Sequence, residues 1–158
     1  MDLQNSGTNT GDAAGETYVL VEGIVASSGN DSLFGNASAN RLFDFDGVDR
    51  VFGRAGNDTL FGGNGNDILN GGAGKDILVG GQDVDAFRFD GANFGDDRIT
   101  DFAVGESIDL TFYAGLMFTD LTIVDVAGRA EVSFANGSIV LAGIQAVDVV
   151  SGMFNFAP

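Results

Sequence analysis

Aspartate recurs every nine residues through the middle of this sequence, in step with glycine. Seven consecutive nine-residue units start at Ala26, and their sixth positions hold Asp31, Asn40, Asp49, Asp58, Asp67, Asp76 and Asp85. Glycine gathers at the first, second and fourth positions, as in Gly47, Gly56, Gly63, Gly65, Gly72 and Gly74. Glycine accepts positive φ angles and lets backbone carbonyl groups approach an ion closely. Carbonyl and carboxylate oxygens are ligands of calcium, magnesium and manganese, so the pattern predicts a series of cation sites.

The rest of the composition narrows the chemistry. The 158 residues, the size of one domain, include no cysteine and no histidine, which excludes disulfides, ordinary zinc or copper sites and the commonest general base. The formal net charge is −16, which argues against nucleic acid as a partner. No run approaches eighteen apolar residues, so we expect no membrane span. We predict a non-catalytic module, with a paired-carboxylate glycosidase as the formal alternative.

The eighth position of every unit is apolar, and this predicts how the units fold. It holds Leu33, Leu42, Val51, Leu60, Leu69, Leu78 and Phe87. Nine residues suffice for one turn and one short strand with the apolar side chain facing inward, so two units would make one full coil. Strands of adjacent coils lie about 4.8 Å apart, which brings the aspartate of unit n near that of unit n+2. Two carboxylates at that distance repel by about 1 kcal/mol in water, so we expect a cation between each pair.

Units five and six, residues 62–79, match the pattern G-G-x-G-x-D-x-U-x completely and resemble the RTX family of calcium-binding nonapeptide repeats. The resemblance implies an all-β, right-handed parallel β-roll that binds several Ca²⁺ ions between its turns. Its ligands would be bridging aspartate side chains and backbone carbonyls of the glycine-rich turns. Unit two has Ser38 and Asn40 in place of glycine and aspartate, so its site should be weak or empty. The extra carboxylates of unit three, Asp44 and Asp46, could bind an ion or face solvent, and we expect them to face solvent.

The segment after the repeats contains D-A-F-R-F (85–89), I-T-D-F (99–102) and I-D-L (108–110). It resembles the closing region of serralysin-type proteases and of the R-modules of mannuronan epimerases. The resemblance implies that Asp101, with Glu106 or Asp109, completes a terminal calcium site against unit six; the alternative is a solvent-facing turn. Alternating residues around A-G-R and N-G turns predict an antiparallel meander that caps the roll.

These observations divide the chain into four parts. Residues 1–16 read as a flexible leader or linker, 17–25 as an N-terminal capping strand, 26–88 as a β-roll of seven units and 89–158 as a C-terminal cap. The last residues, 143–158, resemble the uncleaved signal that a type I secretion apparatus reads, although an ordinary terminal strand fits equally well. An extracellular, secreted location follows from this resemblance.

Phenylalanine fills the ninth position of the first four units, at Phe34, Phe43, Phe52 and Phe61. These side chains should point out of the roll, Phe34 and Phe52 on one sheet and Phe43 and Phe61 on the other. Exposed phenylalanine rings need cover. The cover could be the N-terminal strand and the C-terminal meander, a homodimer or partner domain, or a sugar ligand.

The function that we predict is calcium-coupled folding of a secreted module. Calcium that binds only the folded roll adds its binding free energy to stability. The chain would therefore stay unfolded before export, where free calcium is scarce, and fold outside the cell. The alternatives are a polysaccharide-binding accessory module for alginate-like chains and a dimerising or adhesive segment of a larger exported protein. A polysaccharide module would need a basic stripe, for which Arg41, Arg50 and Arg54 are the candidates.

Overall fold

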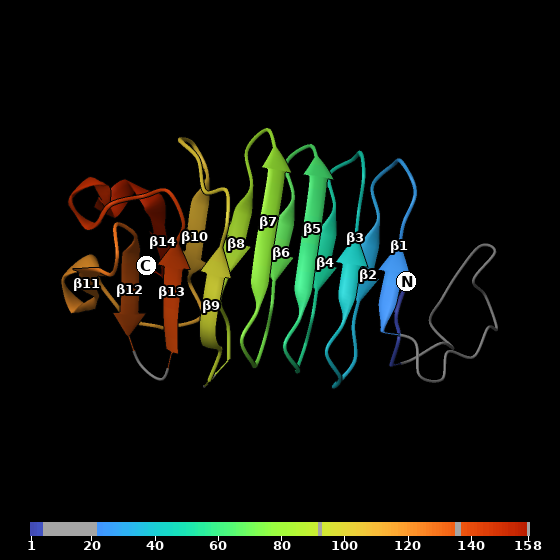
Figure 1. Ribbon diagram of the computed structural model, residues 1–158, viewed down its shortest axis with the longest axis horizontal. Coiled ribbons are helices and arrows are strands. Elements are labelled where there is room, and N and C mark those ends of the chain that lie inside the picture. Colours follow the sequence, from blue (N-terminus) through green and yellow to red (C-terminus); the bar gives the residue numbers. More distant parts are fainter. Residues whose placement is uncertain (5–21, 92, 135–136, 158) are drawn as a thin grey trace.

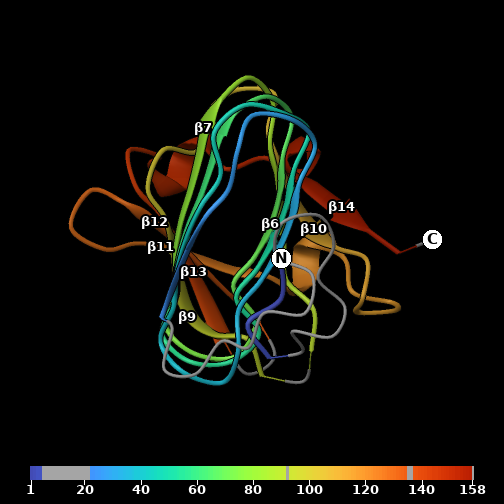
Figure 2. The same cartoon turned by 90° about the vertical axis from the view of Figure 1, so that its right-hand side faces the viewer.

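The chain forms a right-handed parallel β-roll that continues into an antiparallel meander (Figure 1). The computed structural model describes residues 1–4, 22–91, 93–134 and 137–157. Two sheets face each other across the interior, as the view along the roll shows (Figure 2). Within the described residues no helix is long and apolar enough to cross a membrane.

From β1 to β10 consecutive strands alternate between the two sheets, which in the described parts of the chain contain eight and six strands. The larger sheet has the order β1 (Gly23–Val25), β3 (Arg41–Phe43), β5 (Thr59–Asn64), β7 (Ile77–Gln82), β9 (Gly95–Ile99), β13 (Gly137–Leu141), β12 (Ala130–Phe134) and β11 (Thr122–Asp125). The smaller sheet has the order β14 (Phe154–Phe156), β10 (Ser107–Leu110), β8 (Ala86–Arg88), β6 (Ile68–Asn70), β4 (Arg50–Phe52) and β2 (Ser32–Phe34). Three short 3-10 helices also lie in the described C-terminal part: η3 (Phe118–Asp120), η4 (Ala146–Asp148) and η5 (Ser151–Met153).

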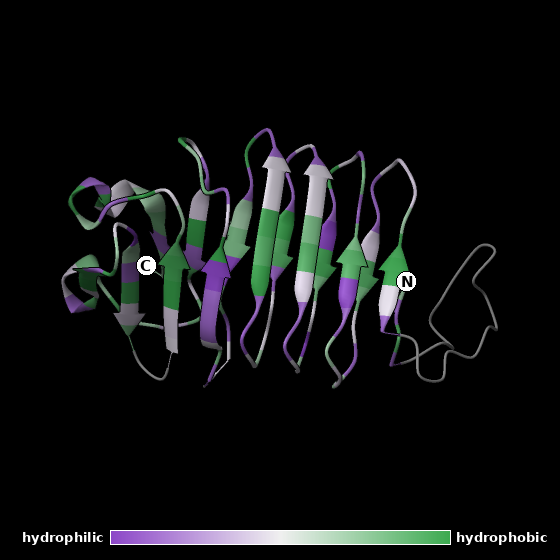
Figure 3. Cartoon of the chain, viewed as in Figure 1, coloured by the Kyte–Doolittle hydropathy of each residue, from purple (hydrophilic) through white to green (hydrophobic). Residues whose placement is uncertain are grey.

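The eighth position of each repeat lies in one of two buried columns, because every strand pairs with the strand two units later. One column runs through Ile24, Leu42, Leu60, Leu78, Ile99 and Leu141. The other runs through Leu33, Val51, Leu69, Phe87, Ile108 and Phe154. All of these side chains are buried. Hydropathy colouring shows the same division, with apolar strand centres and mostly hydrophilic turns (Figure 3).

The C-terminal part extends the roll before it turns antiparallel. Strand β13 pairs parallel with β9, while β12 and β11 pair antiparallel and form the meander predicted from the sequence. Three aromatic rings fill the space inside this end: the Phe94 and Phe134 ring centroids are 5.0 Å apart, and the Tyr113 ring is 5.1 Å from that of Phe134. Strand β14 closes the smaller sheet beside β10.

Residues 1–4 lie along β2, the end strand of the smaller sheet. The Leu3 N–H donates to the Phe34 carbonyl at 2.9 Å, and the Phe34 N–H donates to the Met1 carbonyl at 2.7 Å. Strand β1 is the corresponding end strand of the larger sheet. The remainder of the predicted leader, residues 5–16, and residues 17–21 of the predicted capping strand lie outside the described residues.

Replacing one residue of the buried column should cost far more stability than replacing an exposed one. Leu60 is 0% exposed, and Leu60→Ala should lower the free energy of unfolding by about 2 to 5 kcal/mol through lost burial and a new cavity. Val25 is 65% exposed, so Val25→Ala should change it by less than about 0.5 kcal/mol. Urea unfolding at one fixed calcium concentration measures the free energy of unfolding of both variants. An equal decrease in the two variants would contradict the role of the buried column as the core.

Candidate metal centre

The aspartates of the repeats form two rows, one along each edge of the roll where the turns lie. The row of the odd-numbered units holds Asp31, Asp49, Asp67 and Asp85, and the row of the even-numbered units holds Asn40, Asp58 and Asp76. In both rows the backbone N–H at the sixth position of one unit donates to Oδ1 of the aspartate two units later, at 2.7 to 2.9 Å. These hydrogen bonds fix one oxygen of each carboxylate and hold the rows in register.

The other oxygen of each carboxylate is buried without a hydrogen-bond partner among the described residues. This holds for Oδ2 of Asp49, Asp58, Asp67, Asp76, Asp85 and Asp97. These side chains belong to residues at most 1% exposed. Leaving a buried acceptor unsatisfied costs about 1 to 3 kcal/mol, and more when it is charged. The rows therefore present repeated oxygen atoms that need a positive partner.

The unpaired oxygen faces the start of its own turn, next to a backbone carbonyl. A Cβ atom built on Gly62 would lie 2.5 Å from Oδ2 of Asp67 and 2.6 Å from the carbonyl oxygen of Gly80. A carboxylate oxygen and a carbonyl oxygen thus border one small space, and glycine keeps this space free. No group of three acidic side chains able to hold a metal forms in the described parts of the chain, so a bound ion would rely on carbonyl oxygens as well. Hard cations such as Ca²⁺ accept this all-oxygen donor set.

Glycine at the fourth position is required by close stacking of the coils. Gly65 has φ 120° and Gly74 has φ 149°, and a Cβ atom on either would collide with the carbonyl oxygen of the fourth-position glycine one coil earlier. The other predicted glycines, Gly47, Gly56, Gly63 and Gly72, also have positive φ. The sequence thus identified the glycines that shape the turns, while their role as carbonyl ligands stays a prediction.

Burial raises the pKa of five carboxyl groups in the two rows. Desolvation is the largest cause, and it raises the pKa of Asp67, Asp76 and Asp85 to about 6, that of Asp58 to about 7 and that of Asp97 to about 8. Backbone hydrogen bonds oppose this rise in every case. Ionising these groups is therefore unfavourable in the protein alone, and a neighbouring cation would reverse the preference.

Asp97 belongs to the even row and was missed by the sequence interpretation. The Asp76 N–H donates to its Oδ1 at 2.8 Å, which makes it the next member after Asp76. It lies 21 residues after Asp76 rather than 18, so the nine-residue period does not reach it. The triplet Asp97-Arg98-Ile99 repeats the form of Asp49-Arg50-Val51, and this local signal could have identified it.

Two of the three residues expected at the terminal site, Asp101 and Glu106, lie near each other, because the charge of Asp101 adds to the effect of burial on Glu106. Asp101 accepts hydrogen bonds from the N–H groups of Gly80 and Gly81 at 3.1 and 3.0 Å, so it meets unit seven and not unit six. Glu106 is buried directly before β10, one coil beyond Asp85, and burial raises its pKa to about 7. Asp109 lies within β10 and accepts the Thr111 N–H, so the structure does not bring it to the edge.

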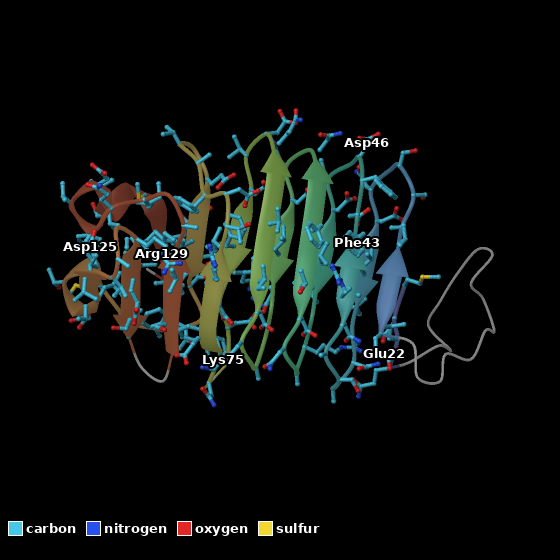
Figure 4. The ribbon with its side chains drawn as sticks, in the orientation of Figure 1. Glu22, Phe43, Asp46, Lys75, Asp125 and Arg129 are labelled. Carbon is cyan, nitrogen blue, oxygen red and sulfur yellow. The ribbon has the colours of Figure 1, made fainter. Side chains whose placement is uncertain are left out.

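Two expectations for units two and three have different outcomes. Asn40 lies within the even row, where its Oδ1 accepts the Asn36 N–H and its amide nitrogen is buried without a partner among the described residues. That the calcium site at Asn40 is weak or empty stays a prediction. The expectation that Asp44 faces solvent is wrong, because this residue is 4% exposed. Asp46 is exposed as expected (Figure 4).

The ninth-position phenylalanines form two stacked pairs on opposite sheets, as the sequence predicts. The Phe34 and Phe52 ring centroids are 5.2 Å apart, and those of Phe43 and Phe61 are 4.4 Å apart. All four are half-buried, and Phe43 is visible on the larger sheet in Figure 4. The meander adjoins β9 at the other end of that sheet, so it does not cover Phe43 and Phe61. Their role as an interface stays a prediction.

The arginines of the repeats do not form a basic stripe. Arg41 lies on the larger sheet and Arg50 on the smaller one. Along the smaller sheet Arg50 is followed in register by Ile68. Arg54 instead reaches back to the N-terminal residues, with its Nη1 2.7 Å from Oδ1 of Asp2. Among the described residues of the repeats, these three arginines therefore do not line up along one sheet.

Comparison with protein families agrees with this geometry. The model of the RTX calcium-binding nonapeptide repeat matches residues 25–60 and 52–87. Residues 25–87 are RTX repeats. The two overlapping matches cover the strands from β2 to β7 completely, and they include all seven sixth-position residues of the two rows.

A similar fold is found in a solved structure. The extracellular lipase LipA from Serratia marcescens is 25% identical with a TM-score of 0.55; the match covers 92% of this chain and 22% of the lipase. Two subunits of a mannuronan C5-epimerase from Azotobacter vinelandii also match. AlgE6R3 is 28% identical over 87% of this chain and 84% of its own, with a TM-score of 0.45, and AlgE6R2 is 24% identical over 88% and 95%, with a TM-score of 0.43. A comparison with curated protein sequences gives no match.

Substituting a fourth-position glycine should separate coil stacking from backbone strain. Gly29 and Gly65 both have positive φ, but a Cβ on Gly29 would meet nothing within 4 Å, whereas one on Gly65 would meet the Gly47 carbonyl. Gly65→Ala should therefore lower the thermal midpoint clearly more than Gly29→Ala, which pays only the cost of a positive φ, about 1 kcal/mol. Equal shifts in calorimetric scans would show that stacking does not constrain Gly65.

The RTX roll without calcium should be more stable in mild acid than at pH 8. In the folded roll Asp58, Asp67 and Asp97 keep their protons up to pH 6 to 8, whereas unfolded aspartates release theirs near 3.8. The free energy of unfolding therefore falls as pH rises between these values. Circular dichroism of metal-stripped protein at pH 5 and pH 8 measures the folded fraction, with calcium-saturated protein as the control. A larger folded fraction at pH 8 without metal would contradict the raised pKa values.

Proposed function

We propose that this chain is a non-catalytic, secreted module that folds and is locked by binding several calcium ions. The observation that carries the proposal is the repeated pair of a buried, unpaired carboxylate oxygen and a nearby backbone carbonyl along both edges. Residues that would hold the ions are Asp49, Asp58, Asp67, Asp76, Asp85 and Asp97 with the carbonyls of the glycine turns. The fit of this donor set to Ca²⁺ supports the same conclusion.

Each unpaired carboxylate oxygen and the carbonyl oxygen beside it form an oxygen cage. Calcium couples to folding because these cages exist only when the coils are stacked. In an open chain neighbouring carboxylates of a row are far apart and fully hydrated. In the roll each loses water, which is the unfavourable change that raises its pKa. An ion that binds only the folded roll adds about 2.7 kcal/mol per site at a concentration of 100 times its Kd. Several such sites would together contribute an amount comparable to the stability of an ordinary domain, about 5 to 15 kcal/mol.

This coupling suits export by a type I secretion apparatus. A chain whose folding waits for calcium stays loose where free calcium is scarce and becomes compact outside. Support comes from the RTX repeats of residues 25–87 and from the fold shared with an extracellular lipase. The C-terminal residues that end in β14 would carry the signal that the apparatus reads. In this proposal the module supports the folding of an exported protein.

The acidic residues with raised pKa values support binding over catalysis. Asp58, Asp67, Asp76, Asp85 and Asp97 lie in the two rows and are accounted for by coil stacking and the proposed ions. Each accepts one backbone hydrogen bond, and the free oxygen faces the interior of a turn. This position suits a bound cation and leaves little access for a glycosidic substrate.

Calcium titration of metal-stripped protein, followed by far-UV circular dichroism, tests the proposal. A cooperative gain of β signal with calcium, and not with magnesium at the same concentration, is expected. Asp67→Asn should raise the calcium midpoint several-fold, because it removes one row charge from an otherwise intact turn. Asp148→Asn is the matched control, since Asp148 is exposed in η4 and makes the same charge change. A wild-type signal that is complete without metal would overturn calcium-coupled folding.

A further inference from the structure

Unit three differs from the later units at its first position, where Asp44 replaces glycine. The backbone there is in the usual place: the Asp44 N–H donates to the Phe61 carbonyl at 3.0 Å, just as the Gly53 N–H donates to the Asn70 carbonyl at 2.9 Å. Any side chain at this position therefore starts from the same point in the coil. The direction in which it leaves can be read from the glycines of the other units.

Side chains at the first position point into the cage. A Cβ atom built on Gly53, Gly62, Gly71 or Gly80 would fall against Oδ2 of the aspartate five residues later in the same unit. This Oδ2 is the buried oxygen that has no hydrogen-bond partner among the described residues. A side chain at the first position thus starts directly against the proposed calcium site.

Asp44 uses this direction. It is 4% exposed, its Oδ1 accepts the Phe45 N–H at 3.2 Å, and its Oδ2 is buried without a partner in the described structure. Asp49 of the same turn also has a buried, unpaired Oδ2. The negative charges that act on Asp44 are those of Asp49, Asp31 and Asp67, the members of the odd row on its own coil and on the coils either side. Two unpaired carboxylate oxygens therefore come from one turn of unit three.

We propose that Asp44 and Asp49 together form a calcium site of higher affinity than the other sites of the roll. The inference rests on the calcium function proposed above and adds one ligand that the repeat pattern does not contain. Calcium affinity rises with the number of charged ligands and with their rigidity, and here the second carboxylate is held in place by burial. In units four to seven glycine occupies the first position, so their cages lack this side chain.

The experiment counts the calcium ions that resist a competing chelator. Calcium-loaded full-length protein is dialysed to equilibrium against a series of concentrations of a weak chelator, and retained calcium is measured by atomic absorption. Wild type should keep one ion after the others have left. Asp44→Asn removes the charge and keeps the size, and Asp44→Gly restores the glycine of the other units. Both variants should lose that last ion at a free calcium concentration at least tenfold higher.

Asp46→Asn is the matched control, because Asp46 lies in the same turn, is exposed and carries the same charge. It should keep the last ion as wild type does. Circular dichroism at saturating calcium checks that every variant is folded. Retention of the last ion by Asp44→Asn and Asp44→Gly would overturn the Asp44 site while leaving the calcium function intact. If wild type binds no calcium, the proposed function fails, and the Asp44 site fails with it.

Discussion

The rest of this structure depends on one hydrogen bond that links each of the first five units to the second unit after it. The backbone N–H at one sixth position donates to the carboxylate of the aspartate one coil further on, so carboxylates are forced into rows at the spacing of β-strands. The bond satisfies one oxygen and leaves the other buried. Burial of this second oxygen raises the pKa of the row carboxyls Asp58, Asp67, Asp76, Asp85 and Asp97 and creates the need for cations. Close stacking of the coils requires the glycines of the turns.

Different interactions hold the interior and the edges of each eighteen-residue coil. Inside, apolar side chains stack in register from Ile24 to Leu141 and from Leu33 to Phe154, and these contacts need no ion. At the edges, charges stack that repel unless neutralised. The columns continue past the last repeat, so the C-terminal part adds further members to an existing stack and does not merely cover its end. Stability of the edges and of the cap is thereby linked through a shared core.

Much of this could be predicted from the sequence, because a fixed period determines which residues share a column. The two buried columns, the two rows and the opposite placement of Phe34 and Phe43 all follow from counting by eighteen. Asp97 was not predicted as a member of the row, because the chain uses 21 residues rather than 18 for that coil. The burial of Asp44 could not be predicted from the sequence either. The direction of a first-position side chain depends on how the backbones of neighbouring coils stack. The pairing of residues 1–4 with β2 has no pattern at all in the sequence.

The ion pair between Arg54 and Asp2 has a consequence for how the roll opens. The end coil of a stack has a neighbour on one side only, so stacked-repeat proteins tend to fray from their ends. Both guanidinium Nη atoms bond the Asp2 carboxylate at 2.7 Å, and this joins residues 52 positions apart. Peeling away residues 1–4 must therefore break a contact made by unit four, in the second coil. Opening at this end should involve the first two coils together, so the smallest cooperative opening is larger than one repeat.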